Sequence, residues 1–248
     1  MKKIIITFWL LTNLLLADKI TIFGASDLKF AMDTIKDEFL KENVEDSINI
    51  VYGSSGKGMR QIENGAPYDI YFSANMDYVK YLHTKGEIVT TPKLYAIGRV
   101  VIWSKNKNFN PEIGFDNFSQ KWVDKIAIAN PIHAPYGEKS KQAMESIGIY
   151  KKIKSQIVFG ENISITAGYI YTQAVEIGVI ALSSALSPNI ANGKYWAYYL
   201  IDDELHKPLN QGYGITKYGS ASTLAKKFYN FMQTDKSNLI MKKFGFVK

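Results

Sequence analysis

Two short loops of small polar residues constrain what this chain can fold into more than any other feature. Residues 23–27 (FGASD) follow an apolar strand pattern, and residues 53–58 (GSSGKG) follow another. Each loop precedes a helical pattern, so the glycines and serines of the loop lie at a helix start. There the free N–H groups and the positive end of the helix dipole point toward a bound ligand. Because two consecutive βα units open at the same edge of a sheet, both loops are expected to serve one anionic ligand.

The second half of the chain contains two more loops of this kind. Residues 127–137 lead from a strand pattern into a helix that is expected to begin at Glu138 or Lys139, and residues 160–164 lead into another helix. A helix start carries N–H groups that have no partner within the helix. The sequence therefore predicts four helix starts around a single cleft.

Several side chains in the first two loops suit capping or ligand contact. Ser26 or Asp27 is expected to cap the first helix, because both side chains accept hydrogen bonds from free N–H groups. Ser55 is expected to donate to a ligand as well as to cap its helix. Lys57 and Arg60 offer an alternative in which a fixed positive charge pairs with the anion directly, although such a charge would also attract sulfate and phosphate.

The alternation of short apolar segments with amphipathic segments predicts an α/β fold. The expected strands are residues 20–23, 48–52, 70–72, 99–103, 125–129, 178–182 and 196–200, and the expected helices are residues 28–40, 57–64, 76–85, 139–147, 165–176 and 221–233. Two further extended stretches, residues 95–104 and 209–216, are expected to be crossovers between two lobes.

These crossovers predict a division of the chain into lobes. The first lobe is expected to comprise residues 18–98 and the returning segment 207–248, and the second lobe residues 99–206. Hinges are expected near Gly98 and Lys207. A site in the cleft between two such lobes would close around its ligand.

The N-terminus carries an export pattern. Two lysines precede an apolar run that ends at Ala17, which predicts a signal peptide over residues 1–17, cleaved near Ala17, and a periplasmic protein. Without Lys2 and Lys3 the formal net charge of +7 falls to +5. The absence of cysteine excludes disulfides and thiolate metal sites, and the lack of basic runs excludes a typical nucleic-acid binder.

Sequence motifs give an enzyme little support. The second loop is neither a G-x-S-x-G nucleophile elbow nor a P-loop, and metal-site spacings such as H-x-x-x-H are missing. The three histidines, His83, His133 and His206, lie in separate elements, and only His133 is near a proposed loop. The sequence therefore predicts a binding protein without enzymatic activity.

Five segments give the chain a resemblance to a known family. They are residues 25–28 (ASDL), 53–56 (GSSG), 61–74 (QIENGAPYDIYFSA), 130–137 (NPIHAPYG) and 177–182 (IGVIAL). In this order and spacing, the chain from residue 19 onward resembles the periplasmic molybdate-binding proteins (ModA) that serve ABC importers. The resemblance implies a two-lobed periplasmic binding protein of type II, each lobe a mixed sheet flanked by helices, with the ligand in the cleft between them.

The resemblance also implies the ligand and its contacts. It predicts that molybdate or tungstate is held by backbone N–H groups and hydroxyls at Ser26, Asp27, Ser55, Tyr136 and Ile163, without a cofactor and without direct coordination of the metal. Tyr136 matches a residue that donates its backbone N–H and, in some members, its phenol. The implied partner is an ABC permease of the inner membrane, and the protein is expected to be a monomer.

Asp27 departs from the family pattern, in which several members carry a neutral serine or asparagine. An ionised carboxylate would repel a dianion in a dry cleft. Three explanations follow for Asp27: it caps the helix with its side chain turned away, it is protonated and donates its own proton, or the cleft prefers a different ligand. Phosphate, sulfate and ferric ion are the alternative ligands under the last explanation.

Overall fold

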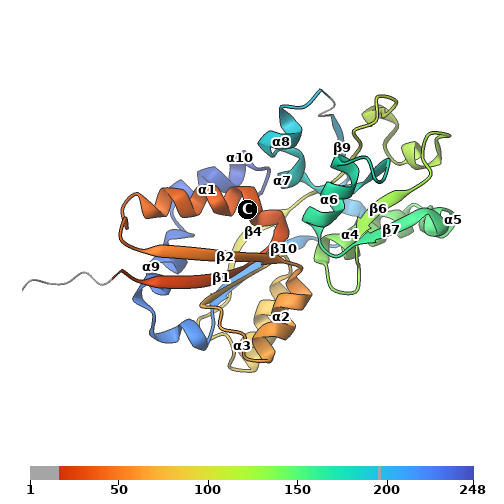
Figure 1. The fold of residues 1–248 in the computed structure, drawn as a ribbon. Helices are drawn as coiled ribbons and strands as arrows, with labels where there is room; N and C mark the ends of the chain where they lie inside the picture. The colour runs from red at the N-terminus through yellow and green to blue at the C-terminus, as the bar shows by residue number, and fades with distance from the viewer. Residues whose placement is uncertain (1–16, 195–196) are drawn as a thin grey trace, which may run out of the picture.

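The computed structural model describes residues 17–194 and 197–248, which form two lobes, each built on a five-stranded sheet (Figure 1). The first sheet has the order β2-β1-β3-β10-β4 and the second the order β7-β6-β8-β5-β9. The strands are β1 Lys19–Ala25, β2 Ser47–Gly53, β3 Ile70–Ser73, β4 Lys93–Gly98, β5 Val100–Trp103, β6 Ile126–Ala129, β7 Ile157–Gly160, β8 Ile177–Ala181, β9 Tyr198–Leu200 and β10 Leu209–Ile215.

Both sheets are mixed. In the first, β1 pairs in parallel with β2 and β3, whereas β10 runs antiparallel to β3 and β4. In the second, β6 pairs in parallel with β7 and β8, whereas β5 runs antiparallel to β8 and β9. The predicted fold class, two lobes that each contain a mixed sheet flanked by helices, is confirmed.

Helices cover both faces of each sheet. They are α1 Lys29–Leu40, α2 Ser55–Glu63, α3 Met76–Thr84, α4 Pro135–Ser146, α5 Tyr150–Ile153, α6 Ile163–Tyr171, α7 Leu182–Ala185, α8 Pro188–Ala191, α9 Thr223–Phe231 and α10 Asp235–Lys243. Short 3-10 turns lie between them: η1 Ser26–Leu28, η2 Pro111–Ser119, η3 Lys154–Gln156, η4 Asp203–Leu205 and η5 Tyr218–Ala221. Helices α1, α9 and α10 pack on one face of the first sheet, and α2 and α3 on the other (Figure 1).

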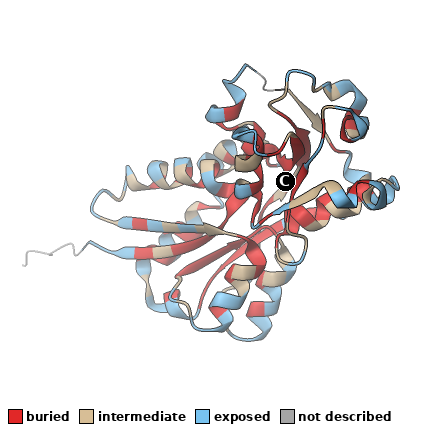
Figure 2. Cartoon of the chain, turned by 45° about the vertical axis from the view of Figure 1, so that its right-hand side comes forward, coloured by how far each residue is buried: buried red, intermediate tan, exposed pale blue. Residues whose placement is uncertain are grey.

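Helix α1 illustrates why these segments fold as they do. Its apolar residues recur at helical spacing, so Met32, Ile35 and Phe39 all point into the core of the first lobe. There the Phe39 ring meets the Phe228 ring of α9 edge to face, with 5.2 Å between ring centroids. The exposed residues of the helix, Lys29, Thr34 and Asp37, are all polar. Buried and exposed segments alternate along the helices of the cartoon (Figure 2). Removal of this apolar face from water is the main stabilising contribution to the helix.

The chain passes directly between the two sheets. Strands β4 and β5 are separated only by Arg99, and the return path runs from β9 through η4 to β10. Thus the first sheet takes its strands from residues 19–98 and 209–215, and the second takes its strands from residues 100–200. The predicted domain boundaries remain a prediction, since strand membership does not define the ends of a domain.

Two helices of the second lobe start earlier than the sequence suggested, each for a local reason. Helix α4 begins at Pro135 rather than at Glu138 or Lys139, because the fixed φ of proline suits the first helical position. Helix α6 begins at Ile163, where the Asn162 side chain accepts a hydrogen bond from the Ile165 N–H at 3.0 Å. It ends at Tyr171 rather than at residue 176.

Further differences concern segments with weak patterns. Helix α2 begins at Ser55 rather than at residue 57, and neither β7 nor α10 was predicted. The signal-peptide prediction concerns residues that lie almost entirely outside the described part of the chain. Within the described ranges, no helix combines the length and apolar character that a membrane crossing needs.

Candidate functional site

A small cavity lies between the lobes, at the carboxyl ends of β1 and β2 and the starts of α2, α4 and α6. Its empty volume is about 190 Å³, part of which is open to solvent. Its lining consists of Ala25, Ser26, Asp27, Gly53, Ser54, Ser55, Ala74, Ala134, Pro135, Tyr136 and Ile163. The fold thus brings all five residues of the sequence-predicted site, Ser26, Asp27, Ser55, Tyr136 and Ile163, to one cavity, and each of them is buried.

Three backbone N–H groups at this cavity are unpaired. Ser55 and Ile163 are the first residues of α2 and α6, and Tyr136 is the second residue of α4. Among the described residues, none supplies a hydrogen-bond acceptor to these three N–H groups. Three helix starts therefore present free donors, and the positive ends of their dipoles, to the same small volume.

No lysine or arginine is part of the lining described above. Lys57 forms an ion pair with Glu161 instead, at 2.9 Å, and Arg60 is exposed on the outer side of α2. The geometry therefore does not support a direct ion pair between these cations and a bound anion. An anion in this cavity would be held by N–H and O–H donors alone.

Ser55 combines two roles through one hydroxyl. Its Oγ accepts a hydrogen bond from the Ala74 N–H at 2.9 Å, which leaves the hydroxyl proton free for a ligand. Its carbonyl accepts from the Tyr71 hydroxyl at 2.6 Å, so the start of α2 is fixed to β3. Ser55 does not cap a helix, because the N-cap residue of α2 is Ser54 and its side chain makes no capping hydrogen bond.

Asp27 lies at the end of a buried chain of hydrogen bonds. The Tyr136 hydroxyl donates to Asp27 Oδ2 at 3.0 Å, and Gln211 Nε2 donates to the Tyr136 hydroxyl at 3.0 Å. The Tyr95 hydroxyl in turn donates to Gln211 Oε1 at 2.6 Å. The Tyr136 phenol therefore gives its only proton to Asp27, and the group of Tyr136 that remains available to a ligand is its backbone N–H.

The other carboxyl oxygen of Asp27 has no partner. Asp27 is 2% exposed, and Oδ1 is buried without a hydrogen bond. Burial raises the pKa of this carboxyl to about 6, and the rise is limited by Gln211, Tyr136 and the backbone N–H of Asp27 itself. The site thus contains a carboxyl group that exchanges its proton close to neutral pH.

The expected capping role of Ser26 or Asp27 is wrong. The residue before η1 is Ala25 and the residue before α1 is Leu28, and neither helix has a side-chain cap. The carbonyls of Ser26 and Asp27 are held from the second lobe instead, by the hydroxyls of Ser164 at 2.8 Å and Ser183 at 2.7 Å. These two hydrogen bonds fix the first loop against α6 and α7.

A second set of contacts joins the lobes through His133. The Gly56 N–H donates to the His133 carbonyl at 2.9 Å, and Ser54 Oγ forms a hydrogen bond with His133 Nδ1 at 2.9 Å. Burial lowers the pKa of His133, and the positive charges of Lys57 and Arg60 lower it further. We call Gly56, Ser54 and His133 the latch, because they join the start of α2 to the loop before α4.

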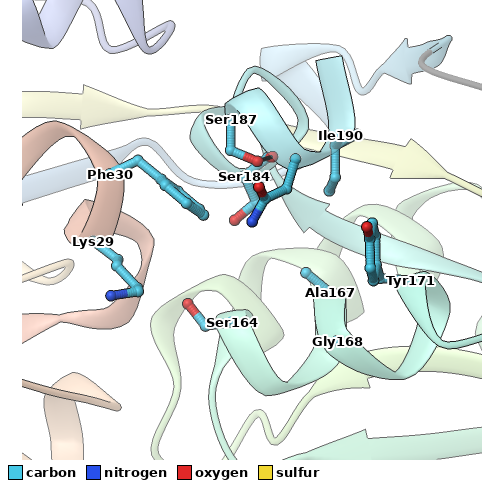
Figure 3. A pocket seen from close by; sticks show the side chains of 10 residues that line it. Lys29, Phe30, Ser164, Ala167, Gly168, Tyr171, Ser184, Ser187 and Ile190 are labelled. Carbon is cyan, nitrogen blue, oxygen red and sulfur yellow. Dashed lines mark hydrogen bonds between the residues drawn. The ribbon is translucent and has the colours of Figure 1, made fainter. Parts of the chain in front are cut away.

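A larger hollow nearby has a different character. It has about 660 Å³ of empty volume, against about 190 Å³ for the smaller cavity, and lies between α1 of the first lobe and α6, α7 and α8 of the second (Figure 3). Phe30, Ala167 and Ile190 supply its apolar wall, and the hydroxyls of Ser164 and Ser187 are already donated to backbone carbonyls. The smaller cavity, where the unpaired N–H groups of three helix starts converge, remains the candidate site.

The sequence did not predict Gln211 and Tyr95, which continue the chain of hydrogen bonds beyond Tyr136. Gln211 and Tyr95 lie in β10 and β4, within the two stretches predicted to cross between lobes. Gln211 is fully buried, and an amide midway between Leu209 and Tyr213 in a strand pattern is a signal that could have drawn attention to it. Ser183 gave no signal, because its partner is a backbone carbonyl 156 residues earlier in the chain.

Known proteins resemble this chain over most of its length. The molybdate-binding protein ModA of Rhodobacter capsulatus is 27% identical over 207 residues, which cover 83% of this chain and 79% of that protein. ModA of Escherichia coli is 25% identical over 234 residues, which cover 92% and 88%. The solved structure of the periplasmic molybdate-binding protein of Azotobacter vinelandii matches with a TM-score of 0.85 at 26% identity, over 92% of this chain and 99% of that one.

The resemblance to the ModA proteins is therefore confirmed by both sequence and structure. A family model described as bacterial extracellular solute-binding protein matches residues 20–247, nearly the whole described chain. Proteins of this kind bind substrates for transporters and are not enzymes. With its two lobes and a donor-lined cavity between them, the chain belongs to the family of bacterial extracellular solute-binding proteins.

Proposed function

We propose that this protein captures molybdate or tungstate in the cavity between its lobes and delivers it to an ABC permease. The observation that carries the proposal is the convergence of the unpaired N–H groups of Ser55, Tyr136 and Ile163 on a cavity whose lining contains no cation. A tetrahedral oxyanion presents acceptors in several directions and needs such donors to replace its hydration shell. The relatives that bind molybdate according to their names support the choice of ligand.

Selectivity in this mechanism arises from the fixed distance between donors. The starts of α2, α4 and α6 are held by the two lobes, so a smaller tetrahedron such as sulfate leaves some buried donors without an acceptor. Each unpaired donor costs on the order of 1–3 kcal/mol. Molybdate and tungstate have nearly the same size and charge, so these donors do not discriminate between the two anions.

The remaining parts of the proposal follow from this role. The protein acts outside the inner membrane, after cleavage near Ala17, and works as a monomer that closes around its ligand. It needs no cofactor, because donors alone hold the anion, and it binds no nucleic acid. Its partner is the permease of an ABC importer, in keeping with membership of a solute-binding family.

Isothermal titration calorimetry of the dialysed protein tests the proposal. The ligands are molybdate, tungstate, sulfate, phosphate and ferric citrate, each titrated into the same preparation. We expect one-to-one binding of molybdate and tungstate and no heat from sulfate. Heat from phosphate alone would favour the alternative in which Asp27 accepts a hydrogen bond from a phosphate hydroxyl, and heat from ferric citrate alone would favour a cation site.

One variant tests the hydroxyl donor of Ser55, and it also removes the acceptor of the Ala74 N–H, so its folding is checked by thermal unfolding without ligand. Ser55→Ala removes the hydroxyl at the cavity and leaves the N–H of the same residue in place. We expect weaker molybdate binding in this variant. Unchanged affinity would limit the site to backbone donors.

A further inference from the structure

Asp27 lines the cavity and has a buried carboxyl oxygen for which the described residues supply no hydrogen-bond partner. The residue is 2% exposed, and the oxygen without a partner is Oδ1. We infer that Asp27 takes up a proton when the oxyanion binds and donates that proton from Oδ1 to a ligand oxygen. This inference rests on the proposed function and adds the uptake of one proton to the binding step.

The direction of the buried hydrogen bonds selects the atom that carries the proton. Tyr95 donates to Gln211, Gln211 donates to Tyr136, and Tyr136 donates to Asp27 Oδ2. Since Oδ2 already accepts a proton from Tyr136, the carboxyl proton belongs on Oδ1. In its acid form, Asp27 then satisfies both of its oxygens once a ligand accepts from Oδ1.

Among the described residues, no lysine or arginine lines the cavity beside Asp27. The titratable groups that sense the charge of Asp27 are the phenols of Tyr136 on α4 and Tyr95 on β4, whose pKa values it helps to raise. On the neighbouring helices, Arg60 of α2 is exposed, and the lysines closest to the cavity in sequence are Lys29 on α1, Lys57 on α2 and Lys139 on α4. Each of these three lysines is paired with a carboxylate of its own. A dianion beside an ionised Asp27 would therefore meet uncompensated repulsion, which protonation removes.

The proton balance of the binding step is simple. One proton from solvent binds to Oδ1 of the Asp27 carboxylate, and the oxyanion enters unchanged as the dianion. No covalent bond of the ligand forms or breaks. Because burial raises the pKa of this carboxyl to about 6 in the free protein, Asp27 is mostly ionised there at pH 8, and up to one proton is taken up as the bound dianion raises this pKa further.

Calorimetry in buffers of different ionisation enthalpy counts this proton. Molybdate is titrated into the full chain at pH 8 in HEPES and in Tris, and the slope of observed enthalpy against buffer ionisation enthalpy gives the uptake. We expect about one proton per ligand and an affinity that falls by up to about tenfold for each pH unit above about 6. Over this range molybdate itself remains the dianion.

Two variants complete the test. Asp27→Asn keeps the shape of the side chain and cannot ionise, so we expect no proton uptake and a pH-independent affinity. Asp124→Asn changes an exposed carboxylate and should retain the proton uptake of the unmodified protein. Binding of molybdate without proton uptake by the unmodified protein overturns the inference and leaves the proposed function intact. Absence of any oxyanion binding overturns the proposed function itself.

Discussion

The latch between the lobes makes Gly56 the most informative single position for closure. A Cβ on Gly56 would lie 2.8 Å from the His133 carbonyl oxygen and 3.1 Å from the His133 Cα. Both atoms are backbone, so the clash cannot be relieved by rotation of a side chain. We predict that Gly56→Ala holds the lobes apart at this edge of the cleft and weakens ligand binding.

The size of the effect follows from the contacts that closure makes there. The Gly56 hydrogen bond to His133 and the Ser54 hydrogen bond to His133 each contribute about 1 kcal/mol. The Lys57 pair with Glu161 is half-exposed and adds little. Loss of about 2 kcal/mol from the closed form corresponds to an affinity for molybdate that is about 30-fold weaker.

Calorimetry with molybdate measures the affinity, and small-angle X-ray scattering measures closure in the same samples. The matched control is Gly168→Ala in α6, where an added Cβ meets no atom within 4 Å. This control should raise helix stability by about 0.5–1 kcal/mol and leave affinity unchanged. Affinity of Gly56→Ala equal to that of the unmodified protein would refute the role assigned to the latch.

Three further changes test separate parts of the structure. Tyr136→Phe leaves Asp27 Oδ2 without its donor and should lower the free energy of unfolding by about 1–3 kcal/mol, measured by urea titration. An unchanged urea midpoint of unfolding would contradict the buried chain of hydrogen bonds. Asn162→Ala removes the cap of α6 and should cost about 1 kcal/mol, seen as a lower Tm in calorimetric scans. Burial raises the pKa of Asp27 from its ordinary value of 3.8 to about 6, so its contribution to stability is greatest below pH 4 and falls by about 3 kcal/mol in all as pH rises through 6. Asp27→Asn should lack this loss when unfolding is measured across that window.

The sequence predicted the parts of the site that depend on local pattern. The loops at residues 23–27 and 53–58 each join a strand to a helix. Small residues at such junctions indicate free N–H groups independently of the tertiary structure. For the same reason Ser55 could be assigned to the cavity before its helix was seen. Tyr136 and Ile163 required the resemblance to a family, and local pattern singled out Asp27 only as a helix cap.

What could not be predicted is the pairing of side chains across long separations. Tyr136 and Asp27 are 109 residues apart, and their hydrogen bond depends on how the two lobes meet. The expected cap at Asp27 was wrong for the same reason, since local preference for a cap does not include a tyrosine that arrives from another lobe. Tertiary contacts decided the role of this side chain.

The position of β10 within the first sheet has a consequence for how the protein can be divided. This strand comes from the end of the chain, yet it lies between β3 and β4 and pairs with both. Deletion of residues 209–248 would therefore remove an interior strand and leave β4 without a neighbour, whereas the second sheet, drawn from one continuous segment, would keep all of its strands. The first lobe cannot be produced from its N-terminal segment alone. A protein assembled from two fragments must contain both that segment and the C-terminal segment that carries β10.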